Sequence, residues 1–527
     1  MKEVIVGKLE DFKDNEMKTV ALDDSDDKVL ISRIDGEFFA VSAFCTHYGA
    51  PLEKGILSDG RIVCPWHHAC FNAKTGDLME PPALDALVSY ELKTQGDNLV
   101  LMLPEEFKGR RKPEMSKAEP SIDKRTFIII GAGAAGYAAA QALRENGYKG
   151  RIIMISRENK LPYDRPNLSK EYLSGEAKEE WMPLRSEDFY DEYGIETVLG
   201  RKVVRLDGST NTVRLDDGTE LEYDKVLVAT GGSARKLDAP GSGLENIFTL
   251  RSFSDADRII DSAEKISRAA VIGASFIGME TAHNLTERGI SVTVIGRESV
   301  PFEKVFGAEI GGMFKTEHEN NGVTFKLERK VSEFKGNGKV ERVILDNGDE
   351  VEAELVIVGI GVEPVTDFIQ GLELDPDGGI KVDEAYRAAK NIYAAGDIAS
   401  YPDMETGKHV RIEHWRTAEQ EGIHAAVNML ENGIPSILVP FFWTAQAGLN
   451  FRYVGHAESW DYLITWGNVS NKDFITFFVS EGKVLAAGGN KRDREMAAIE
   501  ELLRLGKMPN PDKLKNTSLN LLKLINK

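Results

Sequence analysis

Residues 127–137 read FIIIGAGAAGY, an apolar run followed by a glycine-rich turn and by residues that favour a helix. The apolar run predicts a buried strand. Gly131 permits a tight turn, Gly133 lets the backbone approach a pyrophosphate, and Gly136 lets helix and strand pack closely. The first turn of the helix offers free N–H groups and the positive end of its dipole to phosphate. A second apolar strand over residues 151–155 leads to Glu158, which is placed to hydrogen-bond a ribose, so the pattern predicts a dinucleotide site.

The composition describes a globular protein of more than one domain. The chain has 527 residues, 42% hydrophobic and 28% charged, and this length exceeds what one core normally holds. A formal net charge of −20 argues against nucleic acid or an anionic membrane as the main partner, because both would repel the chain. No apolar run is long enough to span a bilayer, and there are three cysteines. We therefore expect no membrane span and a reducing, cytoplasmic location.

Changes of pattern divide the chain. Residues 1–103 contain short alternating runs separated by turn signals and predict an all-β domain. Residues 104–125 carry prolines among charged residues without an apolar period and predict a linker. From residue 126 strands and helices alternate, which predicts an α/β region with parallel sheets. Residues 440–527 begin with aromatic-rich strands and end in a helical tail, which predicts an α+β domain.

The α/β region contains an internal repeat. Its two units begin and end with residues 128–133 and 152–158, and with residues 270–278 and 292–298. In the second unit Gly273 and Gly278 flank Ser275, which replaces the middle glycine, and its Cβ restricts the approach of a pyrophosphate. Two such units predict two nucleotides, one of which can stay bound while the other exchanges.

Two short motifs in the β domain carry metal-binding side chains. Cys45 and His47 form CxH, and after sixteen intervening residues Cys64 and His67 form CxxH. Two thiolates and two imidazoles suit either tetrahedral zinc or a [2Fe–2S] cluster with both histidines on one iron. Each motif contributes one cysteine and one histidine, whereas zinc fingers favour CxxC with HxxxH. The spacing therefore favours the iron–sulfur cluster.

The residues around these motifs, CTHYGAPL at 45–52 and CPWHHACF at 64–71, resemble the Rieske family. The positions that carry an extra disulfide in respiratory-type members are Ala50 and Trp66 here, so the resemblance is to the ferredoxin-like and oxygenase-type members. Cys70 is then expected to be a buried structural thiol. We expect His68 to face solvent or a backbone carbonyl rather than the iron.

Four segments resemble the ferredoxin-reductase and apoptosis-inducing-factor group of FAD enzymes: LPYDRPNLSK at 161–170, YDKVLVATGG at 223–232, AAGDI at 394–398 and RIEHW at 411–415. The resemblance implies that Arg165 and Lys170 lie near the isoalloxazine and that Trp415 lies beside the ring system. It also pairs Lys170 with Glu280 near flavin N5. It places Asp397 by the ribityl–pyrophosphate portion, where we expect the aspartate to cap a helix aimed at phosphate.

These motifs give a full set of expected site residues. The expected FAD and NAD(P)H contacts are Gly131, Gly133, Ala135, Gly136, Glu158, Arg165, Lys170, Ala229, Thr230, Gly231, Gly273, Ser275, Gly278, Glu280, Arg297, Glu298, Gly396, Asp397, Glu413, His414 and Trp415. Lys170, Glu280 and Trp415 are expected to act in the reaction, and Cys45, His47, Cys64 and His67 to bind the cluster. The expected glutathione-reductase-like domains are FAD-binding over 126–250 and 376–439 and NAD(P)H-binding over 251–375.

The choice between NADH and NADPH stays open. An acid directly after the second strand would favour NADH by binding the ribose 2′-hydroxyl, but this position is Gly296. Arg297 suits a 2′-phosphate, whereas Glu298 can turn back toward the ribose.

The domain order resembles the Rieske-bearing, apoptosis-inducing-factor-like reductases (the mitochondria-associated factor 3 subgroup). This resemblance implies an FAD-dependent oxidoreductase that passes electrons from NAD(P)H through FAD to a fused Rieske cluster and on to an unidentified one-electron acceptor. Two alternatives stay open: a reductase component that serves a separate oxygenase, and a redox-sensing, pro-apoptotic type of binding protein with slow NADH oxidation. A homodimer is also left open.

Overall fold

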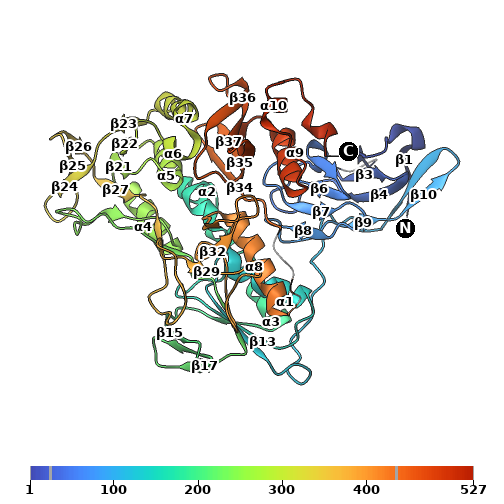
Figure 1. The fold of residues 1–527 in the computed structure, drawn as a ribbon, viewed down its shortest axis with the longest axis horizontal. Helices are drawn as coiled ribbons and strands as arrows, with labels where there is room; N and C mark the ends of the chain where they lie inside the picture. Colours follow the sequence, from blue (N-terminus) through green and yellow to red (C-terminus); the bar gives the residue numbers. More distant parts are fainter. Residues whose placement is uncertain (1, 23–25, 432, 434–436, 526–527) are drawn as a thin grey trace.

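The computed structural model of the chain describes residues 2–22, 26–431, 433 and 437–525. The N-terminal β domain, drawn blue in Figure 1, lies on one side of the molecule, and the parallel-sheet units form the rest of its body. The C-terminal region, drawn red, lies between the blue domain and the green part of the chain. Among the described residues, no helix has the length and apolar character needed to cross a membrane. The expected multidomain order is confirmed.

The N-terminal domain consists of short antiparallel strands, as the alternating pattern predicts. One sheet contains β1 (Lys2–Lys8), β11 (Asn98–Leu103) and β10 (Leu92–Gln95). A second contains β2 (Glu16–Ala21), β3 (Lys28–Ile34), β4 (Glu37–Ser42) and β9 (Ser89–Tyr90), and a third contains β5 (Ile56–Ser58), β6 (Arg61–Val63), β7 (Cys70–Asn72) and β8 (Leu78–Glu80). The helical elements of this region are the single turns η1 (Leu9–Asp11) and η2 (Leu52–Lys54).

The first parallel unit is a six-stranded sheet in the order β14 (Ile195–Val198), β13 (Arg151–Ile155), β12 (Thr126–Ile130), β18 (Lys225–Val228), β31 (Ile392–Ala394) and β30 (Arg387–Ala389). All neighbours are parallel except the edge strand β30. The strand expected over residues 151–155 is confirmed as β13. Helices α1 (Ala134–Glu145) and α8 (Trp415–Met429) pack against each other. Gly422 permits this contact, because a Cβ there would lie 2.2 Å from the carbonyl oxygen of Ala135.

Smaller elements surround this sheet. They are η3 (Arg165–Ser169), α2 (Glu171–Ser174), η4 (Glu179–Trp181), α3 (Glu187–Tyr193), β15 (Val203–Asp207), β16 (Thr212–Leu215), β17 (Glu220–Glu222), β19 (Gly232–Ala234), β29 (Ile380–Lys381), β32 (Ala399–Pro402) and β33 (His409–Val410).

The second parallel unit repeats the first on a smaller scale. Its sheet runs in the order β20 (Ile247–Phe248), β27 (Leu355–Val358), β21 (Arg268–Ile272), β22 (Ser291–Ile295) and β23 (Thr324–Lys326). The helices are α4 (Phe253–Ala263), α5 (Phe276–Glu287), α6 (Glu303–Phe306) and α7 (Ala308–Asn320), and the remaining strands are β24 (Val331–Lys335), β25 (Arg342–Leu345), β26 (Glu350–Glu352) and β28 (Val362–Pro364).

The C-terminal region is a five-stranded antiparallel sheet covered by helices. Its strands follow the order β34 (Phe441–Gln446), β35 (Leu449–Gly455), β38 (Lys483–Asn490), β37 (Asp473–Ser480) and β36 (Tyr462–Asn468), with α9 (Asp493–Arg504), α10 (Pro511–Leu514) and η5 (Leu521–Lys523) after them. Helix α9 packs on β35 and β38 and also touches β5 of the N-terminal domain. This region therefore contacts domains at both ends of the chain.

Residues 104–125 contain no helix and no extended strand. They nevertheless follow the protein surface. Arg111 exchanges two backbone hydrogen bonds with Ala86, and Ser116 donates from its N–H and its hydroxyl to the carbonyl of Arg144. This segment is thus hydrogen-bonded near its middle to the N-terminal domain and to the first parallel unit.

Candidate functional site

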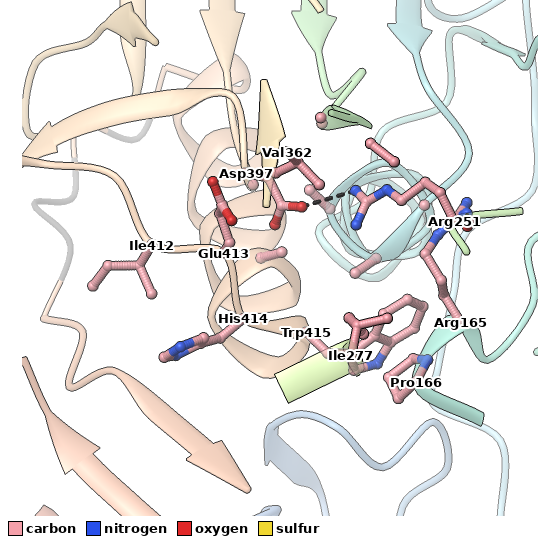
Figure 2. Close-up of a pocket in the computed structure, with 18 of the residues that line it drawn as sticks. Arg165, Pro166, Arg251, Ile277, Val362, Asp397, Ile412, Glu413, His414 and Trp415 are labelled. Carbon is pink, nitrogen blue, oxygen red and sulfur yellow. Dashed lines mark hydrogen bonds and ion pairs between the residues drawn. The ribbon is translucent and has the colours of Figure 1, made fainter. Parts of the chain in front are cut away.

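A cavity of about 640 Å³ lies where the two parallel units meet the C-terminal sheet. Most of the expected cofactor residues line it: Gly131, Gly133, Ala135, Glu158, Arg165, Lys170, Ala229, Thr230, Gly231, Ser275, Glu280, Gly396, Asp397, Glu413, His414 and Trp415. Figure 2 shows part of this lining, in which Arg165, Arg251, Asp397 and Trp415 come from four different segments. Gly136, Gly273, Gly278, Arg297 and Glu298 do not line the cavity.

The first glycine-rich turn has the geometry of a phosphate cradle. Gly131 has a φ of +120°, and a Cβ there would lie 2.1 Å from the carbonyl oxygen of Ala229. A Cβ at Gly136 would lie 1.9 Å from the carbonyl oxygen of Gly131. These two glycines are therefore needed for the fold, whereas a Cβ at Gly133 would meet no atom within 4 Å and would fill the open space at the start of α1. That space, in front of free N–H groups, fits a pyrophosphate.

In the second turn the serine has a structural role of its own. Ser275 is the N-cap of α5, where its hydroxyl accepts from the N–H of Gly278 at 3.2 Å and donates to the carbonyl of Gly359 at 2.7 Å. Beyond β22, Arg297 is exposed and Glu298 forms an ion pair with Lys304 at 3.0 Å. Neither side chain reaches the cavity.

Glu158 is held by two neighbours at the end of β13. Arg165 donates to Oε1 at 2.9 Å, and the hydroxyl of Tyr163 donates to Oε2 at 2.7 Å. Burial raises the pKa of the Glu158 carboxyl, but these donors outweigh it and lower the pKa, so the group is ionised. A carboxylate fixed at this edge of the sheet can accept from a ribose hydroxyl.

Asp397 does not cap a helix, so that expectation is wrong. The chain turns after Gly396 and continues into β32, and the next helix, α8, begins at Trp415 with His414 as its N-cap residue. Asp397 instead accepts from Arg251 at 2.9 Å, the ion pair drawn in Figure 2. Burial lowers the pKa of His414 to about 4, so this residue beside Trp415 is neutral.

Lys170 and Glu280 form the pair that the resemblance implies. Lys170 Nζ lies 2.7 Å from Oε2 of Glu280, which also accepts from the hydroxyl of Ser169 at 2.6 Å. The other oxygen, Oε1, accepts from the hydroxyl of Thr444 in β34 at 2.6 Å. Glu280 is 2% exposed, and its carboxylate accepts all three of these hydrogen bonds.

The network continues away from the cavity. Gln446 donates from Nε2 to the Thr444 hydroxyl at 2.7 Å, and His318 Nε2 lies 2.8 Å from Gln446 Oε1. Burial lowers the pKa of His318 to about 4. The sequence indicates no role for Thr444, Gln446 or His318. The contacts that tie them to Glu280 and to each other join residues up to 164 positions apart, and no local motif marks them.

The two metal motifs lie on neighbouring loops that close in the same way. The N–H groups of Cys45 and Cys64 donate to carbonyls five residues further along the chain, at 2.8 and 2.9 Å. The thiols are 3% and 1% exposed. The loops bring Nδ1 of His47 and Nδ1 of His67 to 3.0 Å. All four expected ligands are therefore brought together.

This donor set fits a two-metal cluster better than a single ion. Burial lowers the pKa of His47 to about 3, so the ring is neutral and can ligate a metal. The thiol of Cys45 contacts the thiol of Cys64, and the Nδ1 atoms of His47 and His67 lie 3.0 Å apart, so the donors are paired by type. A [2Fe–2S] cluster uses such pairs, with the thiols on one iron and the imidazoles on the other.

His68 does not face solvent or a backbone carbonyl, so the expectation for this residue is wrong. Its side chain is fully buried, its Nδ1 contacts Oε2 of Glu500 in α9, and its ring stacks on Phe441 at 4.0 Å. The C-terminal domain covers the surface on which the ring would have been exposed. Cys70 is fully buried, as expected, and burial raises the pKa of its thiol.

The histidine ligands lie close to the cavity of the same chain. The ring of His67 lies 4.6 Å from the ring of Trp443, and Trp443 lines the cavity. Tyr48 stacks on His47 at 3.9 Å and donates its hydroxyl to Asp164, next to Arg165. One aromatic side chain thus separates the cluster site from the space that fits FAD.

Comparison with known families assigns each part of the chain. Residues 2–91 match the Rieske [2Fe-2S] domain, residues 125–422 the pyridine nucleotide-disulphide oxidoreductases and residues 441–525 the reductase C-terminal domain. Apoptosis-inducing factor 3 from Homo sapiens is 37% identical over 96% of this chain and 84% of its own length. The ferredoxin–NAD(+) reductase subunit of the benzene 1,2-dioxygenase system from Pseudomonas putida is 32% identical over 75% of this chain and 96% of its own. The solved covalent putidaredoxin reductase–putidaredoxin complex covers 76% of this chain and 98% of its own, with 29% identity and a TM-score of 0.72.

Proposed function

The chain belongs to the pyridine nucleotide-disulphide oxidoreductase family and carries a Rieske domain, and from this premise we propose how its residues work. It is an FAD-dependent oxidoreductase that passes electrons from NAD(P)H through FAD to the Rieske cluster. When bound, FAD would supply two-electron chemistry toward NAD(P)H and one-electron chemistry toward the cluster, from which a separate one-electron acceptor would be reduced.

The residues that line the cavity bind and orient FAD. The Gly131–Gly133 turn and the start of α1 hold the pyrophosphate, and Glu158 accepts from the ribose. The Glu280 carboxylate fixes the Lys170 ammonium inside the cavity, where its charge stabilises the electron density that a reduced flavin carries. Trp415 offers an aromatic face to the ring system.

Cys45 and Cys64 would hold one iron, and His47 and His67 the other. The two cysteines are buried, which keeps water away from their sulfur atoms, whereas the two histidines are partly exposed. The observation that carries the proposed function is the position of Trp443, whose ring contacts His67 and also lines the flavin-side cavity. Because this arrangement lies within one chain, electron transfer to the cluster requires no second protein.

Anaerobic titration with NADPH and NADH tests the proposal. Flavin absorbance and the paramagnetic signal of the reduced cluster are followed in the same sample. We expect the cluster signal to appear as the flavin is reduced. A preparation that carries zinc in the N-terminal domain, or a reduced flavin beside a cluster that stays oxidised, would contradict the proposal.

A further inference from the structure

A buried set of charged side chains joins the Rieske domain to two other domains. At its centre is Arg416 of α8, which is 1% exposed and follows Trp415 in the sequence. Its Nε donates to the carbonyl of Pro81 at 2.9 Å, and its Nη2 donates to Glu80 at 2.7 Å, both in the Rieske domain. Its Nη1 forms an ion pair at 2.7 Å with Glu500 in α9 of the C-terminal domain. One guanidinium, carried by α8, therefore contacts both the Rieske domain and the C-terminal domain.

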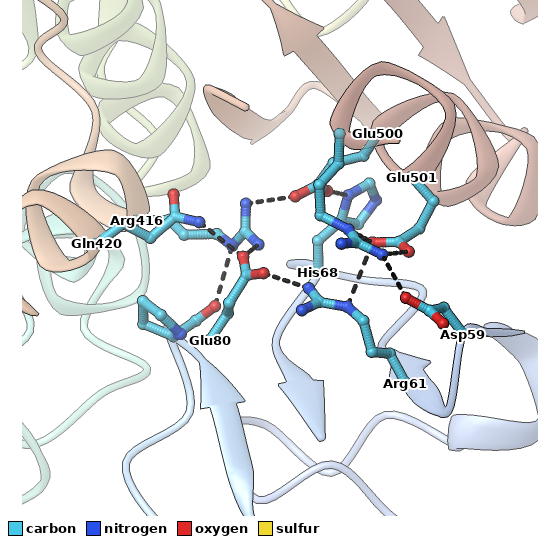
Figure 3. A network of polar contacts seen from close by, with 10 residues as sticks. Asp59, Arg61, His68, Glu80, Arg416, Gln420, Glu500 and Glu501 are labelled. Atoms are coloured by element: carbon cyan, nitrogen blue, oxygen red, sulfur yellow. Dashed lines mark hydrogen bonds and ion pairs between the residues drawn. The ribbon is translucent and has the colours of Figure 1, made fainter. Parts of the chain in front are cut away.

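Further charges extend this junction, as Figure 3 shows. Arg61 of the Rieske domain contacts Glu80 and lies 3.5 Å from Glu501 of α9. Glu501 also pairs with Arg504 at 2.8 Å. The side chains of Glu500 and Glu501 are 7% and 2% exposed. Withdrawal of the Rieske domain would separate Arg416 from Glu80 and Pro81 and Arg61 from Glu501, so this set of contacts is complete only in the docked position.

The cluster-binding loop is held from the same side. Nε of Arg452 in β35 donates to the carbonyls of Pro65 and Trp66, at 3.1 and 3.0 Å, and its Nη1 pairs with Asp493 at 2.8 Å. Apolar contacts complete the junction, because buried Ile56, Val63 and Cys70 share one core cluster with Phe441 and with residues of α9. The loop that carries Cys64 and His67 is thus packed into the C-terminal domain.

We propose that the Rieske domain is held in one fixed position on the rest of the chain, so that electrons pass from FAD to the cluster without a domain movement. The electron-transfer part rests on the function proposed above. Arg416 is a positioning residue, because it acts on the cluster through Glu80, Pro81 and Glu500 and not through the reacting atoms. A domain that swings between flavin and acceptor would instead need contacts that open readily, and this junction buries both ion pairs and an apolar core.

The test uses the full chain with a protease recognition sequence inserted after Gly109, where the backbone is exposed and a Cβ would meet nothing within 4 Å. After cutting, we expect both fragments to elute together and the NAD(P)H-driven reduction of the cluster to stay first order, within about twofold of the uncut rate and independent of protein concentration. Fragments that separate at micromolar concentration, or a rate that depends on concentration after cutting, would overturn the proposal.

A variant removes the central contact. In the cuttable chain, Arg416→Met leaves the carboxylates of Glu80 and Glu500 without its guanidinium in the docked state, and we expect the fragments to dissociate about 100-fold more readily. Lys112→Met is the control, because it removes an exposed ion pair with Glu192 that lies within the C-terminal fragment, and it should leave the fragments together. Equal affinity in Arg416→Met and in the control would refute the role of Arg416.

Flavin and cluster spectra of every sample separate this proposal from the proposed function. Fragments that stay together while the cluster is never reduced would contradict the electron-transfer function and leave the fixed docking standing. A cluster that is reduced in the intact chain, combined with fragments that separate after cutting, would contradict the docking alone.

Discussion

The hydroxyl of Thr444 provides a direct test of the network behind Lys170. Thr444 is 1% exposed, donates to Glu280 at 2.6 Å and accepts from Gln446 at 2.7 Å. Thr444→Val replaces the hydroxyl with a methyl group of similar size. The change therefore removes two hydrogen bonds while it leaves the packing of β34 nearly unchanged.

The expected loss follows from the partners. A hydrogen bond to a charged group is worth about 1.5–3 kcal/mol, and an unpaired buried N–H on Gln446 costs about 1–3 kcal/mol. We expect the free energy of unfolding to fall by about 2.5–6 kcal/mol. Glu280 keeps Lys170 and Ser169 on its other oxygen, so only part of this loss reaches the ammonium. Because about 1.4 kcal/mol corresponds to a tenfold change in rate, we expect flavin reduction to slow by about 3- to 10-fold.

The free energy is measured by urea titration followed through flavin fluorescence, and the rate by stopped-flow reduction with NAD(P)H. Thr476→Val is the matched control, since Thr476 is equally buried in the same sheet and its hydroxyl pairs with that of Thr465 at 3.0 Å rather than with a charged group. It should cost about 1 kcal/mol and leave the rate unchanged. Thr444→Ser should restore both quantities. If Thr444→Val matches the control in stability and in rate, the reasoning about this network is wrong.

The remaining predictions concern the cofactor sites and one buried histidine. Gly131→Ala should abolish FAD binding and the expression of a folded flavin domain, because its Cβ would strike the carbonyl of Ala229. Gly133→Ala should fold normally and weaken only the affinity for FAD, as measured by flavin release. Cys45→Ser should remove the cluster absorbance and the reduction of a one-electron acceptor such as cytochrome c but leave flavin reduction by NAD(P)H intact; unchanged cytochrome c reduction would contradict this. Burial lowers the pKa of His318 from its ordinary 6.5 to about 4. Below pH 6.5 the unfolded chain takes up a proton at this residue and the folded chain does not, so the free energy of unfolding declines as the pH falls toward 4. Between pH 7 and pH 5, the free energy of unfolding of His318→Gln should therefore fall by about 2 kcal/mol less than that of the parent chain, as measured by urea titration. Equal decreases in the two proteins would refute the assignment.

The features that the sequence predicts well are those whose cause is local. The strand, glycine turn and helix at residues 127–145 follow from sterics within a dozen residues, and the same pattern identifies the repeat at residues 270–278. The metal motifs behave likewise, because each loop closes on itself between a cysteine and a carbonyl five residues later. Local geometry thus decides where these cofactor-binding elements form.

The features that the sequence does not predict depend on distant partners. His68 has the sequence context of a surface residue, but its partner Glu500 lies 432 positions away and buries it. Asp397 follows a strand as an N-cap aspartate does, yet the chain then forms β32, and Arg251 from another domain takes the carboxylate. No spacing rule connects such pairs, because the contact exists only after the domains have assembled.

The same reasoning explains why charged residues hold the Rieske domain in place. An apolar surface tolerates many relative orientations, whereas the guanidinium of Arg416 is planar and satisfies Glu80, Glu500 and the carbonyl of Pro81 in one arrangement only. Buried ion pairs add little net stability compared with apolar contacts of equal size. The ion pairs at this junction therefore set the orientation, because they determine which side of the Rieske domain faces the flavin cavity, while the apolar core beside them contributes most of the binding free energy. Electron transfer between the two sites needs a short and constant distance, and the charged contacts keep that distance constant.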